Sequence, residues 1–219
     1  MSNAIDAVIP LHAVAGDPEL LAAWREGDSR AGQELFARYF EPVSRFFANK
    51  VSTDHEDLIQ ETFEACLRGR DRLRNDGSFR SYLFSVAFNV LKVYFRRMRA
   101  TEHVGELGSA SIHDIAPGPS TLVGAAQQEQ LLLDGLRRIP MDLQVVLEMR
   151  YWEDMSSTEI GTALGIPAAT ARSRLVRGRE LLERAIAQLP ANPHTRDSTL
   201  AELEDWLDRI RATLQVVPA

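Results

Sequence analysis

The segment from Ser78 to Arg99 constrains the fold most, because helical spacing sorts its side chains into three separate stripes. Two of the stripes are apolar. One contains Phe79, Leu83, Val86, Val90 and Tyr94, and the other contains Phe84, Phe88, Leu91 and Phe95. The third is polar and basic, and contains Ser81, Ser85, Asn89, Lys92, Arg96 and Arg99. This pattern predicts a helix that is buried on two sides and offers its remaining face to nucleic acid.

The distribution of charge favours that prediction, although the net charge does not. The chain has 219 residues and a formal net charge of −6, which by itself argues against a nucleic-acid-binding protein. Residues 67–100, however, carry nine basic and two acidic side chains, and the stretch Ile160–Arg179 carries four arginines and no acidic residue. These two basic segments are the candidate phosphate-contacting surfaces. Residues 1–66 carry more acidic than basic side chains, and this segment would suit a basic protein partner instead.

Nearly all periodic segments have helical spacing, so the sequence predicts an all-α protein. We expect two small helical domains joined by a flexible linker, with a helix-turn-helix in the second domain and one further helix at the C-terminus, from about Ser198 to Gln215. The expected boundaries are 1–17 for an N-terminal arm, 18–100 for the first domain, 101–124 for an acidic linker rich in Gly, Ser and Pro, 125–189 for the second domain and 190–219 for a C-terminal extension. Thr53 and Glu56 form a capping-box pattern that predicts a helix start there.

The second DNA-binding pattern lies in the second domain. Ser156 and Glu159 form a capping box, Gly165 suits a left-handed turn, and Pro167 suits the first turn of the following helix. The buried side of that helix is expected to contain Ala171, Leu175, Gly178 and Leu182. Its outward positions are small, polar or basic, which is typical of a recognition helix in the major groove. A helical hairpin with a solvated arginine face would give the same pattern.

Several short motifs follow one another in a fixed order along the two domains. Asp57–Phe63 reads DLIQETF, Gly77–Phe84 reads GSFRSYLF, and Arg96 and Arg97 follow in the first domain. Together with Leu136–Ile186, these motifs resemble those of bacterial sigma factors of the extracytoplasmic-function (ECF) class. The resemblance implies a protein without catalytic activity that binds core RNA polymerase, recognises the −10 and −35 promoter elements and promotes DNA opening. The implied partners are the clamp helices and flap of the polymerase and promoter DNA, and an anti-sigma factor remains open as a third.

The resemblance also implies a role for individual residues. The residues that would bind polymerase are Asp57, Gln60, Glu61 and Glu64. The residues that would bind the −10 element are Ser81, Tyr82, Ser85, Asn89, Lys92, Arg96, Arg97 and Arg99. The residues that would bind the −35 element are Ala169, Thr170, Arg172, Ser173, Arg174 and Arg177. Tyr82 stands where the family often has Trp, and Phe88 where it often has Arg, which leaves the −10 base preference open. Tyr82 is equally compatible with a half-buried core position.

Other classes of protein find less support in the sequence. The single cysteine, Cys66, lies in an apolar helical pattern and is expected to be a buried, unreactive thiol. The five histidines are scattered and no phosphate-binding loop or nucleophile motif is present, so we expect no metal, no cofactor and no enzymatic activity. No signal peptide or apolar run of about 20 residues is present, which predicts a cytoplasmic protein without membrane insertion.

The C-terminal extension leaves the main alternative function open. A heptad seam contains Leu200, Leu203, Leu207, Ile210 and Leu214. Such a seam would serve packing on the second domain, a regulatory contact or dimerisation. A dimer would suit a stand-alone helix-turn-helix regulator. The Asp57–Phe63 motif and the linker between two DNA-binding domains favour the sigma factor over that regulator.

Overall fold

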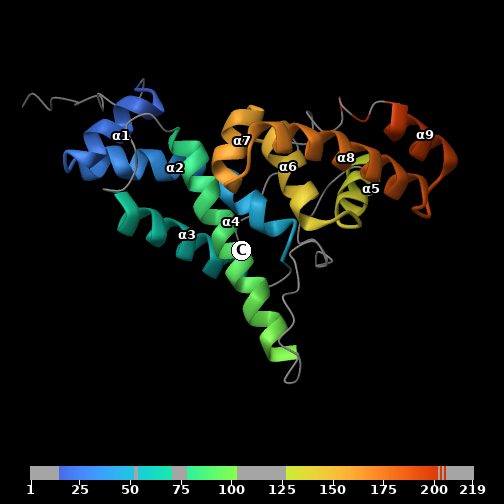
Figure 1. Ribbon diagram of the computed structural model, residues 1–219, viewed down its shortest axis with the longest axis horizontal. Coiled ribbons are helices and arrows are strands. Elements are labelled where there is room, and N and C mark those ends of the chain that lie inside the picture. The colour runs from blue at the N-terminus through green and yellow to red at the C-terminus, as the bar shows by residue number, and fades with distance from the viewer. Residues whose placement is uncertain are drawn as a thin grey trace, which may run out of the picture.

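The computed structural model describes residues 15–51, 54–70, 78–102 and 127–201, together with Leu203 and Asp205. Every regular element within these residues is a helix (Figure 1), which confirms the all-α class. The helices are α1 (Asp17–Arg25), α2 (Ser29–Ala48), α3 (His55–Gly69), α4 (Phe79–Glu102), α5 (Gln127–Leu136), α6 (Met141–Tyr151), α7 (Ser157–Leu164), α8 (Ala168–Ala187) and α9 (Pro193–Ala201). We call α1–α4 the N-terminal unit and α5–α9 the C-terminal unit.

Local signals build the helix-turn-helix of α7 and α8. The Ser156 hydroxyl accepts a hydrogen bond from the Glu159 N–H at 3.2 Å, and the Glu159 carboxylate accepts one from the Ser156 N–H at 2.9 Å. Gly165 ends α7 with a left-handed φ of 67°. The capping box and the glycine turn are therefore confirmed. Pro167 lies at the N-cap of α8, immediately before its first turn.

Two other helices begin at different residues from those that the sequence predicts. Helix α3 begins at His55, and its N-cap is Asp54 in a left-handed conformation with φ of 62°. The helix cannot continue back through a residue of that conformation, so the predicted capping box at Glu56 is wrong, and Thr53 itself lies outside the described residues. Helix α9 begins at Pro193 rather than near Ser198, because proline suits a first helical turn and the Asn192 side chain accepts a hydrogen bond from the His194 N–H.

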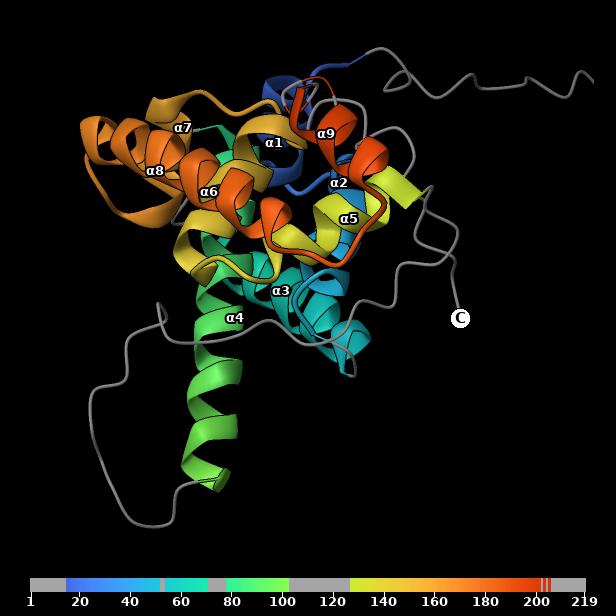
Figure 2. The same ribbon diagram turned by 90° about the vertical axis from the view of Figure 1, so that its right-hand side faces the viewer.

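The N-terminal unit packs its helices around both apolar stripes of α4. Leu83 and Phe84 are fully buried and represent the two stripes, and they share one core with Leu35 and Phe47 of α2. Cys66 is buried in the same core, and desolvation raises the pKa of its thiol to about 12, which keeps it protonated. The last turns of α4 project beyond the other described helices (Figures 1 and 2).

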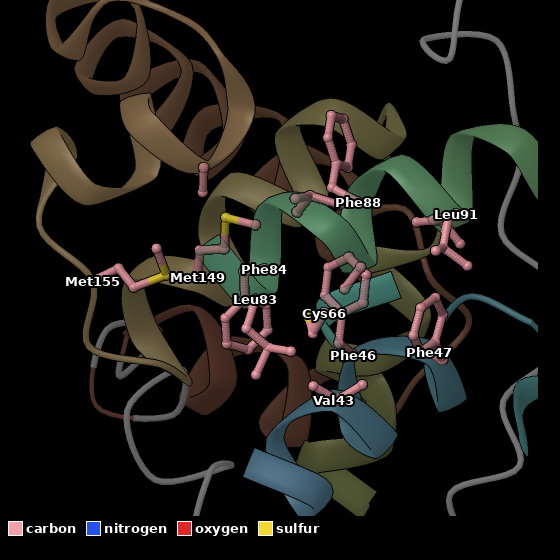
Figure 3. Packing of buried hydrophobic residues seen from close by; sticks show 14 of the residues in the cluster. Val43, Phe46, Phe47, Cys66, Leu83, Phe84, Phe88, Leu91, Met149 and Met155 are labelled. Atoms are coloured by element: carbon pink, nitrogen blue, oxygen red, sulfur yellow. The ribbon is translucent and has the colours of Figure 1, made fainter. Parts of the chain in front are cut away.

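The two units are packed against each other. Helix α7 lies against α4, and Phe84 and Phe88 of α4 belong to the same buried cluster as Met149 and Met155, which lie at the end of α6 and before α7 (Figure 3). A second cluster joins α5, α6, α8 and α9, and Leu203 beyond α9 is buried in it. The first part of the C-terminal extension thus lies against α5 and α8, whereas Leu207, Ile210 and Leu214 fall outside the described residues.

Candidate nucleic-acid interface

Helix α3 carries an exposed acidic face. Asp57, Gln60 and Glu64 are exposed and Glu61 is half-buried. Gln60 donates a hydrogen bond to Glu64 at 2.9 Å, and this bond lowers the pKa of the Glu64 carboxyl. The predicted polymerase-binding residues therefore share one open surface, with Glu64 held ionised at neutral pH.

Apolar side chains that were not predicted from the sequence as part of a site border this acidic face. Phe40 of α2 is 51% exposed and Leu67 of α3 is 52% exposed. The Phe40 ring stacks on Phe63 with an interplanar angle of 8° and a centroid separation of 6.4 Å. Because large apolar side chains are normally buried, their exposure beside a charged face favours a protein-binding surface. The Phe40–Phe63 stack joins two helices and is a contact of the folded chain, so no local sequence pattern indicated this surface.

The polar stripe of α4 is open along most of its described length. Asn89, Arg96 and Arg97 are exposed, and Ser85 and Lys92 are partly buried. The Lys92 ammonium lies 4.9 Å from the centroid of the Phe88 ring, which positions it by a cation–π contact. The side chain of Arg99 lies outside the described residues. The structure thus places cations beside a polar strip, as a nucleic-acid-binding surface requires.

One predicted residue at the start of this stripe lies deeper than expected. Ser81 is only 3% exposed, so its assignment to the open face is wrong. Ser81 lies on the same side of α4 as Phe84 and Phe88, three and seven residues further on. Because that side of the helix is buried, Ser81 is buried as well. Tyr82 is partly buried, which agrees with the second of the two positions that the sequence left open for it, and a Cβ at Gly69 would require the Tyr82 side chain to shift.

The N-terminal half of α8 presents most of the predicted −35 residues. Ala169, Arg172, Ser173 and Arg177 are exposed, and Thr170 is partly buried. On the opposite side of the helix, Ala171 and Gly178 are buried against the core, which confirms the predicted inner face at these positions.

Arg174 differs from its neighbours because a buried carboxylate holds it. Its guanidinium lies 3.5 Å from the carboxylate of Asp142 in α6, and the Asp142 side chain is almost completely buried. Because the guanidinium of Arg174 is held by this carboxylate, it is less free to bind a DNA phosphate. Among the described α8 arginines, Arg172 and Arg177 are therefore the better placed for DNA.

The acidic face of α3 and the basic stripe of α4 meet at one point. Arg97 of α4 lies 3.9 Å from Glu61 of α3, and both side chains are solvent-accessible. An exposed pair at this distance contributes at most about 1 kcal/mol to stability. It nevertheless places a predicted polymerase contact beside a predicted DNA contact.

A network of charged side chains crosses from the N-terminal unit to the C-terminal unit. The Lys50 ammonium forms an ion pair with Glu148 of α6, and this carboxylate also accepts hydrogen bonds from Asn49 at 2.9 Å and Gln144 at 2.8 Å. Burial lowers the pKa of Lys50, while Glu148 opposes that shift.

Two further arginines extend this network. Arg45 of α2 forms an ion pair with Glu153 at 3.0 Å, and both side chains are buried. Arg80 of α4 donates to the Glu153 carbonyl at 2.7 Å and to the Glu159 carboxylate at 2.9 Å. No motif in the sequence pointed to these residues, although Arg45 and Lys50 place two charges in the Val43–Val51 stretch, next to Phe46, Phe47 and Ala48.

The described residues contain neither a candidate metal-binding cluster nor a candidate membrane-spanning helix. Among them, no group of three or more histidine, cysteine, aspartate or glutamate side chains is placed to hold a metal ion. None of the described helices combines the length and apolar character that a membrane span needs.

Comparisons with known proteins point to one family. Residues 35–101 match the family description "Sigma-70 region 2", and residues 129–182 match "Sigma-70, region 4". The ECF RNA polymerase sigma-E factor of Haemophilus influenzae is 27% identical over 184 residues, which cover 79% of this chain and 96% of that protein. The sigma-E factor of Escherichia coli K12 is 25% identical over 182 residues, which cover 79% and 95%.

Solved structures share the fold. CnrH in complex with the cytosolic domain of CnrY has a TM-score of 0.56 at 20% identity, over 78% of this chain and 97% of that one. The sigma factor RpoE in complex with the anti-sigma factor NepR from Bartonella quintana also has a TM-score of 0.56, at 19% identity, over 72% and 98%.

Proposed function

Since this chain belongs to the ECF sigma factors, which bind RNA polymerase for promoter recognition and initiation, we propose that its acidic α3 face is the surface that binds core polymerase. The observation that carries this assignment is the separation of charge between α3 and the helices α4 and α8. The contacting residues are Asp57, Gln60, Glu61 and Glu64. Phe40 and Leu67 add apolar area at its border, and the carboxylates orient the complex on a basic partner surface.

The stripe of α4 would bind the −10 element as the duplex opens. Opening exposes unstacked bases, which bind best to aromatic and small polar side chains beside a cationic track. The proposed contacts are Tyr82, Ser85, Asn89, Lys92, Arg96, Arg97 and Arg99. Ser81 is left out of this set because it is buried.

The N-terminal half of α8 would read the −35 element as duplex in the major groove. The proposed contacts are Ala169, Thr170, Arg172, Ser173 and Arg177. Arg172 and Arg177 reach base edges or phosphates, whereas Arg174 is held on Asp142 and serves to position the helix. The C-terminal unit would also contact the polymerase flap.

The remaining assignments follow from this role. We propose that the chain acts in the cytoplasm with no catalytic activity and no cofactor of its own. An anti-sigma factor is a further proposed partner. The solved RpoE structure is a complex with the anti-sigma factor NepR, and the solved CnrH structure is a complex with the cytosolic domain of CnrY.

Removing the two exposed arginines of α8 tests the −35 assignment. We expect Arg172→Ala and Arg177→Ala each to weaken binding to a −35 duplex, and each to reduce the slope of log affinity against log salt by about 1, because one phosphate contact is lost. Fluorescence anisotropy at several salt concentrations measures both quantities. Arg184→Ala, on the exposed far half of α8, is the matched control and is expected to leave them unchanged. Equal slopes for all of these proteins would contradict the assignment.

A further inference from the structure

The charged network between the two units has no part in the polymerase and DNA contacts proposed above. Three basic residues of the N-terminal unit, Arg45 of α2, Lys50 just after α2 and Arg80 of α4, are joined to Glu148, Glu153 and Glu159 of the C-terminal unit. We propose that this network is an intramolecular latch, which holds the free protein in a closed form that cannot span a complete promoter. The proposal rests on the proposed function, because it supposes that both units bind DNA.

The centre of the latch is the pair of Lys50 and Glu148. Their side chains are 0% and 2% exposed, and Asn49 and Gln144 donate two further hydrogen bonds to the same carboxylate. If the units separated, both charges would return to water. In the closed form each is tolerated only because the other is present, since an unpaired buried charge is strongly destabilising. The pair therefore ties the closed form to one relative placement of the two units.

The network is also incomplete, which suits a contact that has to open. Arg45 Nε, Asn49 Oδ1 and Arg80 Nε are buried, and no described group forms a hydrogen bond with them. Each such atom loses its hydration on closure without full compensation. Separation of the units returns these atoms to water, so part of the cost of breaking the ion pairs is recovered. The closed form is consequently held together less strongly than the apolar cluster beside the network would suggest.

The geometry of the closed form does not match that of a promoter. Elements centred about 25 base pairs apart lie roughly 85 Å apart along a duplex that rises 3.4 Å per base pair. In the closed form α4 packs on α7 and α7 packs on α8, and packed helices are typically about 8–10 Å apart. The two DNA-binding helices therefore approach within roughly 20 Å, and the units must separate before both elements are bound. The proposed polymerase contacts lie on both units, on the acidic face of α3 and at the flap contact of the C-terminal unit, so the closed form cannot make all of them at once and binds polymerase less tightly than the open form.

Reversing one charge of the central pair should open the latch. Glu148→Lys places two ammonium groups together in the full-length chain, and we expect its radius of gyration in small-angle X-ray scattering to increase clearly. We also expect core RNA polymerase to bind it about tenfold more tightly, because the binding-competent population rises. The swapped variant Lys50→Glu with Glu148→Lys restores opposite charges and should restore the compact form.

Two controls keep the test decisive. Glu183→Lys makes the same charge change on the exposed side of α8 and should leave the protein compact. If Glu148→Lys loses helix content in circular dichroism, Arg80→Met takes its place, because the Arg80 side chain is partly exposed and its removal strains the fold less. A helical but still compact open-latch variant overturns the proposal, and so does a swapped variant as expanded as the single one. Expansion without polymerase binding by any variant would keep the latch and reject the proposed function instead.

Discussion

Reversing the charge of the α3 face, with Asp57→Lys and Glu61→Lys together, is expected to abolish binding of the chain to core RNA polymerase. Both carboxylates are solvent-accessible, and like charges brought together across an interface cost several kcal/mol. We expect the affinity in a surface-binding assay with purified core polymerase to fall by at least about a hundredfold, which corresponds to about 2.8 kcal/mol. Run-off transcription should be lost with it.

The matched control changes the same number of charges elsewhere. Glu180→Lys with Glu183→Lys lies on exposed positions of α8 and should leave polymerase affinity close to that of the unaltered protein. Neither pair should alter the fold, since exposed ion pairs such as Glu61 with Arg97 contribute little to stability. Polymerase binding that survives the α3 reversal would show that another surface makes the contact.

The second large effect is expected from Gly161→Ala in the helix-turn-helix. A Cβ at position 161 would lie 2.7 Å from the Ile166 carbonyl oxygen and 3.3 Å from the Ala168 nitrogen. The Ile166 oxygen is backbone of the turn that joins α7 to α8, and the Ala168 nitrogen is backbone of the first residue of α8, so neither can move aside without moving α8. We expect the free energy of unfolding to fall by about 2–3 kcal/mol, as for an overpacked core, and binding to a −35 duplex to weaken.

Thr162→Ala provides the comparison for this substitution. Thr162 is exposed and adjacent in α7, so its change tests helix propensity and a single hydroxyl hydrogen bond to Thr158. Its stability in thermal unfolding should stay within about 0.5 kcal/mol of the unaltered protein. A Gly161→Ala protein as stable as Thr162→Ala would mean that the turn accommodates a Cβ.

Structural features that depend on residues close together in the sequence were predictable. The start and end of α7 depend on Ser156, Glu159 and Gly165, which act within one or two turns, and all three behave as predicted. The start of α3 was not predictable, because the left-handed Asp54 depends on how the preceding chain enters the helix. Local patterns therefore located the helices better than they located every boundary.

The contact between the two units could not be predicted from such patterns. Lys50 and Glu148 are 98 residues apart in the sequence, and neither residue alone shows that the other is its partner. Long-range contacts also explain the position that was assigned wrongly to the open face, because Ser81 lies at an edge of α4 that is buried in the assembled core. The pairing of Arg174 with Asp142 was equally unpredictable from local patterns, and the contact of Arg174 with the −35 element stays a prediction.

The 3.9 Å approach of Glu61 to Arg97 has a thermodynamic consequence for the order of assembly. A polymerase that forms an ion pair with the Glu61 carboxylate would remove the counter-charge from Arg97. The affinity of this side of α4 for a DNA phosphate would then rise. By linkage, DNA on α4 strengthens the polymerase contact by the same factor. With polymerase on α3 and DNA on α4, as proposed, this pair would make the binding of the two ligands cooperative although it contributes little to stability. That cooperativity is measurable as a difference in polymerase affinity with and without a −10 strand.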